Sequence, residues 1–291
     1  MSRVALIGAG RMGLPMCGNL VSAGHTVTAT DLRPEVAGAV TAAGAAWAPT
    51  AHEAVAGAEV VLTVLPGAPE VRDLMPGLLP ALRGATWVDM TSNSPQVAAP
   101  LRELARDVAV LEAPMGGGIE AARDGTLRLF VGGDAEVLAG VRPVLAAVAD
   151  RITLVGGHGA GYTAKLLVNL LWFGQAVATA EALLLGRRAG LDLGLLHQVL
   201  SESPAGSEFL RRDVPSLFEG DYLRSFGLDR CCEELDAVAE LARAHDLPFA
   251  LSELVGEIHR RALTHYGPVD GELQAVALLE EEARTLLRPL S

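Results

Sequence analysis

Lysine is almost absent from this sequence. Lys165 is the only one, so that 22 of the 23 basic residues in the 291-residue chain are arginines. An ammonium group can lose its proton, whereas a guanidinium group in a protein does not. We therefore interpret Lys165 as a place where arginine cannot substitute, which indicates proton transfer. The alternative is a single solvated lysine on the surface.

Positive charge is scarce as a whole. The net charge is −12, the isoelectric point is about 5.0, and the arginines are scattered among more numerous carboxylates. Because binding to nucleic-acid phosphates requires a basic patch, we expect no nucleic-acid partner.

Cysteine is scarce as well. Cys17, Cys231 and Cys232 form no CxxC pair, and no histidine lies at metal-ligand spacing from them. We therefore expect neither a disulfide framework nor a metal site. The first residues enter a strand without a signal-peptide pattern, so we expect a cytoplasmic protein.

One long apolar run covers residues 166–186, but Asn169, Gln175, Thr179 and Glu181 interrupt it. A glutamate in the middle of a membrane is costly, so we interpret the run as a soluble helix and expect no membrane partner. A helix that is apolar on nearly every side needs partners on every side. This predicts a place between two domains or two subunits, and hence a homo-oligomer.

Strand and helix patterns alternate in the first half of the chain, and helical periodicity dominates from Tyr162 onward. Such alternation predicts a parallel, doubly wound sheet, and the chain is long enough for two domains. We expect an α/β domain over residues 1–161 and an all-helical domain, for substrate binding and oligomerisation, over residues 162–291. The expected strands are residues 4–7, 26–30, 60–65, 86–89, 108–111 and 127–131, with a helix at 12–23.

A glycine-rich turn follows the first expected strand and opens the first expected helix. Its spacing is GxGxxG: the first glycine permits a tight turn, the second lets the backbone approach a pyrophosphate, and the third allows close helix packing. The first domain is thereby predicted to be of the Rossmann type and to bind a dinucleotide at the helix N-terminus. The expected contacts are Gly8, Gly10, Arg11, Met12 and Gly13.

Asp31 lies 18 residues beyond Gly13, at the end of the second expected strand. A carboxylate there accepts hydrogen bonds from ribose hydroxyls and repels a 2′-phosphate, which favours NAD over NADP. Arg33 could serve a 2′-phosphate instead, so NADP stays open as the cofactor.

Asn169 lies one helical turn after Lys165, so the two side chains share a face of the expected helix. Asparagine is rare, occurring only as Asn19, Asn93 and Asn169. We interpret Asn169 as a positioned donor and acceptor; the alternative is a buried amide that ties down neighbouring backbone.

Several segments resemble one known family. They are residues 6–20 (LIGAGRMGLPMCGNL), 64–66 (VLP), 89–95 (DMTSNSP), 113–118 (APMGGG), 125–127 (GTL), 132–133 (GG) and 159–169, which include Lys165. Together they are similar to the 3-hydroxyisobutyrate dehydrogenase group of β-hydroxyacid dehydrogenases over nearly the whole chain.

The resemblance implies an NAD(P)-dependent oxidoreductase that interconverts a β-hydroxy acid, or a related small alcohol, and its aldehyde or ketone. It implies a Rossmann domain joined by a long helix to an all-helical domain, in a homodimer or homotetramer. Lys165 is assigned as the general acid/base and Asn169 as its partner, because the hydroxyl proton must leave as hydride passes to the nicotinamide.

The resemblance also assigns binding loops. Those for the cofactor include Leu65, Pro66 and Thr91, and those for the substrate include Ser92, Met115, Gly116, Gly117 and Gly118. Trp172 is a candidate for lining the pocket, with core packing as the alternative.

Two positions depart from the family pattern. Gly116 stands where the family has a serine hydroxyl for the substrate carboxylate, and Glu233-Glu234 stands where it has a Lys-Asp pair. Either these glutamates face water, or the substrate carries a group, such as an amine, that the carboxylate of Glu233 attracts.

Two other functions stay open. Imine reductases share the architecture but replace the lysine with Asp or Tyr, and reduction of an imine or of an amine-bearing substrate is the first alternative. A dinucleotide-sensing protein without catalysis is the second. Such a sensor would not need a titratable lysine beside Asn169.

Overall fold

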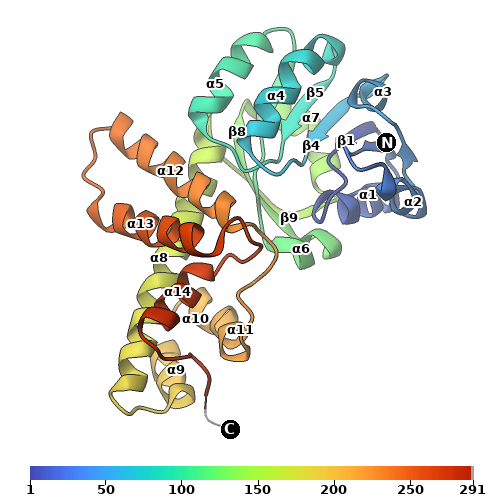
Figure 1. Ribbon diagram of the computed structural model, residues 1–291. Helices are drawn as coiled ribbons and strands as arrows, with labels where there is room; N and C mark the ends of the chain where they lie inside the picture. The colour runs from blue at the N-terminus through green and yellow to red at the C-terminus, as the bar shows by residue number, and fades with distance from the viewer. Residues whose placement is uncertain (290–291) are drawn as a thin grey trace. The chain divides into compact units, whose positions relative to one another are not determined.

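The computed structural model describes residues 1–289. The chain divides into two compact units, Met1–Lys165 and Leu166–Ser291 (Figure 1).

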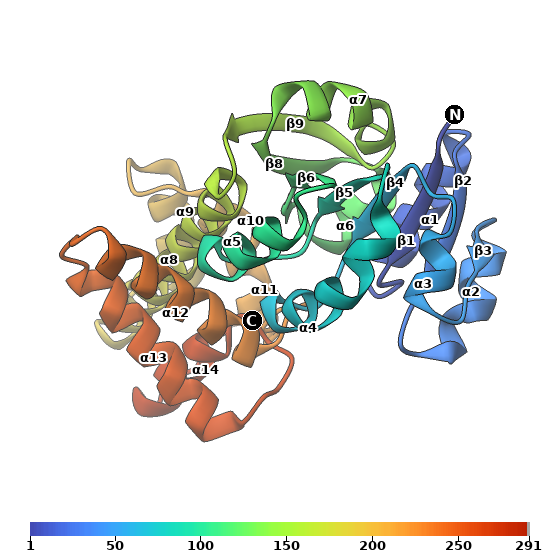
Figure 2. The ribbon, with the colours of Figure 1, turned by 90° about the horizontal axis from the view of Figure 1, so that it is seen from above.

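The first unit is built on one sheet, whose strands follow the order β3-β2-β1-β4-β5-β6-β8-β7, with β9 beside β8 (Figure 2). The sequence order reverses between β1 and β4, which is the switch point where doubly wound folds bind dinucleotides. The strands are β1 Arg3–Ile7, β2 Thr26–Thr30, β3 Ala46–Trp47, β4 Val60–Thr63, β5 Thr86–Asp89, β6 Ala109–Glu112, β7 Met115–Gly116, β8 Leu127–Gly133 and β9 Ala149–Gly156.

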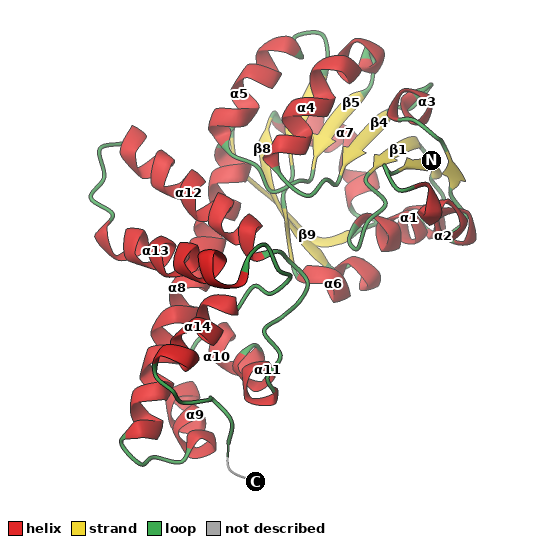
Figure 3. Ribbon diagram, in the orientation of Figure 1, coloured by secondary structure: helices red, strands yellow, loops and turns green. Residues whose placement is uncertain are grey.

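Helices cover this sheet because its central strands are apolar on both faces. In β1, Val4 and Leu6 pack in one buried cluster with residues of α1, whereas Ala5 and Ile7 pack in another with residues of α4. Successive strand residues point to opposite faces, so a strand buried on both sides is a continuous apolar run. Figure 3 shows the strands and the helices of this unit. The helices are α1 Gly13–Ser22, α2 Ala37–Ala42, α3 Ala51–Val55, α4 Ala68–Leu78, α5 Pro95–Leu104, α6 Gly118–Asp124 and α7 Ala135–Leu145, with 3-10 turns at Pro34–Val36 and Leu79–Leu82.

The doubly wound α/β fold is confirmed, but the sheet is not parallel throughout. β8 runs antiparallel to β6 and β7 and parallel to β9. The sequence also fails to predict β3, β7 and β9. The first two have only two residues each, too few for an alternating pattern, and β9 carries exposed polar residues such as Arg151 and Thr153.

The described part of the second unit is helical. Helix α8, Ala160–Arg188, begins in the first unit and continues through the second, where its residues contribute to two buried apolar clusters. The other helices are α9 Leu193–Glu202, α10 Glu208–Arg212, α11 Val214–Glu219, α12 Leu228–Ala244, α13 Ala250–Tyr266 and α14 Gln274–Glu282.

Helix α8 corresponds to the long apolar run. Among the described residues it is the one helix long and apolar enough to cross a membrane, a test that core helices of soluble proteins also pass. The expectation that it is buried on nearly every side is wrong for the single chain. Its exposed positions recur at the spacing of one helix face. They include Leu167, Val168, Leu171, Ala178, Ala182 and Leu185.

His259 in α13 is fully buried within the second unit. Its ring packs against Phe173, and its Nδ1 lies 2.8 Å from the carbonyl oxygen of Val255. Burial lowers the pKa of His259 from 6.5 to about 4, because the charged imidazolium would lose its hydration.

We expect His259→Leu to make the stability less sensitive to acid. The unfolded chain protonates this side chain near pH 6.5 and the folded chain only near pH 4, so its stabilising contribution is complete above pH 6.5 and is lost as the pH falls toward 4. Urea unfolding at pH 7 and pH 5 measures the loss. The wild type should lose about 2 kcal/mol more than the variant over this interval. Equal losses would contradict the assignment.

Candidate functional site

The glycine-rich turn between β1 and α1 leaves no space for side chains at two of its glycines. Gly8 has a φ of +102°, and a Cβ there would lie 2.2 Å from the carbonyl oxygen of Val64. A Cβ on Gly13 would lie 1.9 Å from the carbonyl oxygen of Gly8. Only glycine fits at either position, because no L side chain tolerates such contacts.

The N-terminus of α1 supplies backbone donors beside this turn. The helix begins at Gly13, its cap residue Met12 makes no side-chain hydrogen bond, and the first turn carries no acidic residue. The first N–H groups of a helix have no partner within the helix, and the helix dipole favours an anion there. Arg11 and Met12 lie within the turn. This arrangement fits the diphosphate of a dinucleotide.

Asp31 follows β2 and is paired with Arg33. The guanidinium Nε of Arg33 donates to Oδ1 of Asp31 at 2.9 Å, and its Nη2 donates to Oδ2 at 3.2 Å. Burial tends to raise the pKa of Asp31, but the hydrogen bonds and the charge of Arg33 outweigh it, so the pKa lies below its ordinary value. Asp31 is therefore ionised and able to accept from a ribose hydroxyl, although Arg33 competes for both of its oxygens.

The loops after β4 and β5 are tied together by Thr91. Its hydroxyl oxygen accepts a hydrogen bond from the backbone N–H of Leu65 at 3.1 Å. Pro66 is exposed beside Leu65, and Ser92 is half-buried beside Thr91. The structure thus brings together Leu65, Pro66, Thr91 and Ser92, and it gives Thr91 a loop-bridging role that its position in the sequence does not reveal.

Asp89, the last residue of β5, is the centre of a buried hydrogen-bond network. Its carboxylate accepts from the hydroxyls of Thr63 and Tyr162, both at 2.8 Å, from the backbone N–H of Thr91 at 3.1 Å and from the amide of Asn93 at 3.3 Å. Burial raises the pKa of Asp89, and these donors oppose the rise. Through Tyr162 the network reaches the first turn of α8.

Glu112, the last residue of β6, meets the same turn. Its Oε1 accepts from the backbone N–H of Gly159 at 2.5 Å, and a Cβ added to Gly161 would lie 3.1 Å from the Cβ of Glu112. Burial raises the pKa of Glu112, opposed by the N–H groups of Gly159, Tyr162 and Gly161. The carboxylate therefore stands at the N-terminal end of α8, where the helix dipole attracts an anion. His158 lies in the loop before α8, and its Nδ1 is 3.8 Å from Oε1 of Glu112.

Lys165 and Asn169 lie one turn apart on α8, and both are half-buried. Lys165 follows Tyr162 by three residues, so the carboxylates of Asp89 and Glu112 fix the turn that precedes it. The Nδ2 of Asn169 donates to Oε2 of Glu234 in α12 at 2.5 Å. The amide of Asn169 thus pairs with a side chain of a neighbouring helix.

The expected substrate loop forms the short strand β7, with Met115 and Gly116, and leads into α6. Gly117 and Gly118 have φ values of +116° and +72°, so both are in the left-handed region. A Cβ on Gly117 would lie 2.6 Å from that of Ala121, whereas one on Gly116 would meet the ring of Phe130 at an ordinary 3.4 Å. Packing therefore requires glycine at 117 but not at 116.

The remaining two candidates lie in the second unit and have partners there. The indole N–H of Trp172 donates to Asp213 at 2.8 Å, and its ring packs edge-on against Phe209. Glu233 is exposed and forms an ion pair with Arg230 at 3.0 Å. These contacts account for Trp172 as a core residue and place Glu233 toward solvent.

Comparisons with known proteins match both units. Residues 3–157 match the model described as the NAD binding domain of 6-phosphogluconate dehydrogenase. Residues 159–279 match the model described as NAD-binding of NADP-dependent 3-hydroxyisobutyrate dehydrogenase. A 3-hydroxyisobutyrate dehydrogenase of Pseudomonas aeruginosa is 39% identical over 71% of this chain and 72% of its own. The chain belongs to the 3-hydroxyisobutyrate dehydrogenase family.

Other members of the family match over more of the chain. An NAD-dependent L-serine dehydrogenase of Pseudomonas aeruginosa is 34% identical over 90% of this chain and 93% of its own. The structure of a 3-hydroxyisobutyrate dehydrogenase from Mycobacterium tuberculosis with L-serine superposes with a TM-score of 0.87 at 30% identity, covering 96% of this chain and 99% of that one. The resemblance in the sequence and the fold class are thereby confirmed.

The sequence analysis did not identify the roles of three residues at the site of this family member. Asp89 and Glu112 each end a strand, and Tyr162 is an ordinary residue of a helix, so only the fold shows that they meet at the start of α8. The sequence did mark the Glu233-Glu234 pair, but only the structure shows that Glu234 is the one that contacts Asn169. One signal was present. A carboxylate at the end of an apolar strand is costly to bury unless it has donors, which marks Asp89 and Glu112 as partnered residues.

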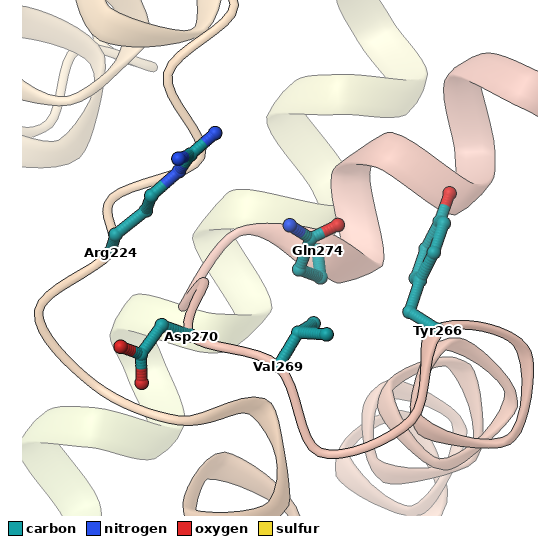
Figure 4. A pocket seen from close by; sticks show the side chains of 5 residues that line it. All are labelled: Arg224, Tyr266, Val269, Asp270 and Gln274. Carbon is teal, nitrogen blue, oxygen red and sulfur yellow. The ribbon is translucent and has the colours of Figure 1, made fainter.

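The second unit also contains an open groove of about 460 Å³, lined by Arg224, Tyr266, Val269, Asp270 and Gln274 (Figure 4). None of the residues that the sequence assigns to the site lines it. Among the described residues no cluster of three or more His, Cys, Asp or Glu side chains could hold a metal ion.

We expect Glu112→Ala to destabilise the first unit and to slow catalysis. The loss of its carboxylate leaves N–H groups at the start of α8 without an acceptor, which costs about 1–2 kcal/mol, as for other helix caps. Calorimetry and steady-state kinetics measure both effects. Glu103→Ala is the matched control, since Glu103 is exposed and pairs with the exposed Arg106. Equal melting temperatures for the two variants would contradict the role of Glu112.

Proposed function

We propose that this protein is an NAD-dependent dehydrogenase that oxidises the hydroxyl group of a small β-hydroxy acid, or reduces the corresponding carbonyl. The observation that carries the proposal is the place of the sole lysine. Lys165 lies one turn into a helix whose start is held by the ends of β5 and β6, beside the loops of a dinucleotide fold. The dehydrogenase and reductase activities for which the relatives are named support the same reaction class.

The reaction requires one proton and one hydride to leave the substrate. The hydride acceptor for the carbinol carbon would be supplied by bound NAD. The neutral amine of Lys165 takes the hydroxyl proton, and the electrons of the O–H bond complete the carbonyl. In the reverse direction the ammonium returns the proton. Asn169 orients the amine of Lys165 and the substrate hydroxyl toward each other.

Residues 1–161 serve in this proposal as the cofactor domain and residues 162–291 as the substrate and oligomerisation domain. The cofactor contacts are Gly8, Gly10, Arg11, Met12, Gly13, Asp31, Leu65, Pro66 and Thr91, with Arg33 as a competitor for Asp31. The substrate contacts are Ser92 and residues 115–118. For Trp172 and Glu233 we propose no direct contact with the substrate. Trp172 packs in the core of the second unit, and Glu233 lies on its surface.

The exposed face of α8 supports a homodimer or homotetramer. Leu171 is 66% exposed and Leu185 71% exposed in the single chain. Apolar side chains that recur along one helix face gain free energy when a second subunit covers them. A cytoplasmic location completes the proposal.

Lys165→Arg tests the function directly. The guanidinium keeps the charge but cannot give up its proton, so kcat should fall by about 10²–10⁴-fold. Binding of NADH, followed by its fluorescence, should be unchanged, because the cofactor loops are intact. A fully active variant would overturn the assignment of Lys165.

Asp31→Ala tests the choice of cofactor. The change removes the ribose acceptor and releases Arg33 to bind a 2′-phosphate, so the ratio of kcat/KM for NAD over NADP should fall by about tenfold. Arg33→Ala is the matched control and should move the ratio the other way, since it frees both oxygens of Asp31. If the two variants shift the ratio alike, Asp31 does not select the cofactor.

Gly116→Ser tests the class of substrate. A Cβ at position 116 meets the ring of Phe130 at an ordinary distance, and the hydroxyl restores a donor to the substrate carboxylate, so kcat/KM for plain β-hydroxy acids should rise by about fivefold. Gly117→Ser is the control and should unfold at a lower temperature because of its positive φ. A fall in kcat/KM for β-hydroxy acids in Gly116→Ser would show that the native substrate presents another group to this loop.

A further inference from the structure

The two adjacent glutamates of α12 have different environments. Glu233 is exposed and paired with Arg230, whereas Glu234 is 7% exposed and accepts the hydrogen bond from Asn169. The second oxygen of Glu234, Oε1, is buried and has no hydrogen-bond partner among the described residues. Leaving a buried carboxylate oxygen without a donor is destabilising, so stability alone does not explain a glutamate here.

The chemistry of this contact fixes the direction of the Asn169 amide. An ionised carboxylate only accepts hydrogen bonds, and an asparagine side chain has a donating end and an accepting end. In the structure, the end that faces Glu234 is the NH2 group. The carbonyl oxygen of Asn169 is left for another donor, and on a helix the side chain leans toward the preceding turn, which carries Lys165.

We propose that Glu234 is a positioning residue that keeps Asn169 as an acceptor toward the proton-transfer site. With this polarity Asn169 receives a hydrogen bond from the ammonium of Lys165 or from the substrate hydroxyl, and it does not donate one to the substrate oxygen. A hydrogen bond accepted from the hydroxyl leaves the oxygen electron-rich and orients its proton. The inference rests on the proposed function for its catalytic consequence, but the amide direction is a property of the protein itself.

Asparagine is rare enough for the amide direction to be observed directly. A sample labelled with ¹⁵N only at asparagine has three side-chain NH2 groups, from Asn19, Asn93 and Asn169. Glu234→Gln should shift the NH2 signals of Asn169 and leave those of Asn19 and Asn93 in place. Glu240→Gln, an exposed residue of the same helix, is the control and should shift none of them. Unchanged Asn169 signals in Glu234→Gln would overturn the proposal, whether or not the enzyme turns over.

Kinetics separate positioning from a merely structural role. Glutamine at 234 keeps the size of the side chain but presents either a donor or an acceptor to Asn169, so the amide is free to reverse. We expect kcat to fall by about tenfold while KM and the melting temperature stay near those of the wild type. A wild-type kcat in Glu234→Gln would show that the contact is only structural.

Exchanging the amide at position 169 with the carboxylate at position 234 gives a rescue test. Asn169→Asp alone places two carboxylates in contact, and its activity should be low. Combined with Glu234→Gln, the aspartate accepts from the glutamine amide and still offers an oxygen, so the double variant should regain about tenfold in kcat over Asn169→Asp. A double variant no better than Asn169→Asp would contradict the polarity. Full activity of Lys165→Arg would instead refute the proposed function and leave the NMR result to decide the inference.

Discussion

Two buried carboxylates at the ends of neighbouring strands hold the first turn of α8, and the candidate chemistry of the protein depends on that contact. Asp89 accepts the hydroxyl of Tyr162, and Glu112 accepts the N–H of Gly159. Each would be costly to bury alone, and the donors of the helix start make burial acceptable. The position of Lys165, three residues beyond Tyr162, follows from this attachment.

Further along α8, a second polar side chain also has a buried carboxylate as its partner. Asn169 donates to a buried carboxylate, Glu234, while its neighbour Glu233 pairs with Arg230 at the surface. In the loop after β2, Asp31 is held by Arg33. Asp31, Glu112 and Asn169 therefore each have their direction set by a named partner, which is the condition for a preorganised reaction geometry.

The fold was largely predictable because its signals are local. The apolar strands, the close-packed Gly8 and Gly13, and the acid at the end of β2 can all be recognised from spacing. The antiparallel β8 could not be predicted, since strand direction depends on distant partners. The burial of Glu234 beside the exposed Glu233 could not be predicted either. Adjacent residues of a helix point about 100° apart, and the sequence alone does not say which of the two faces the core. For α8, the apolar composition of the run concealed the face that is exposed in the single chain.

Chemical rescue at position 165 shows whether the amine of Lys165 carries the proton. Lys165→Cys should be inactive, and treatment with 2-bromoethylamine converts the cysteine to a lysine analogue with an amine in nearly the same place, while Cys17, Cys231 and Cys232 are buried. We expect this treatment to restore oxidation of the β-hydroxy acid, whereas alkylation with iodoacetamide, which adds no amine, should not restore it. Equal activity after both treatments, or an active untreated variant, would contradict the claim that Lys165 carries the proton.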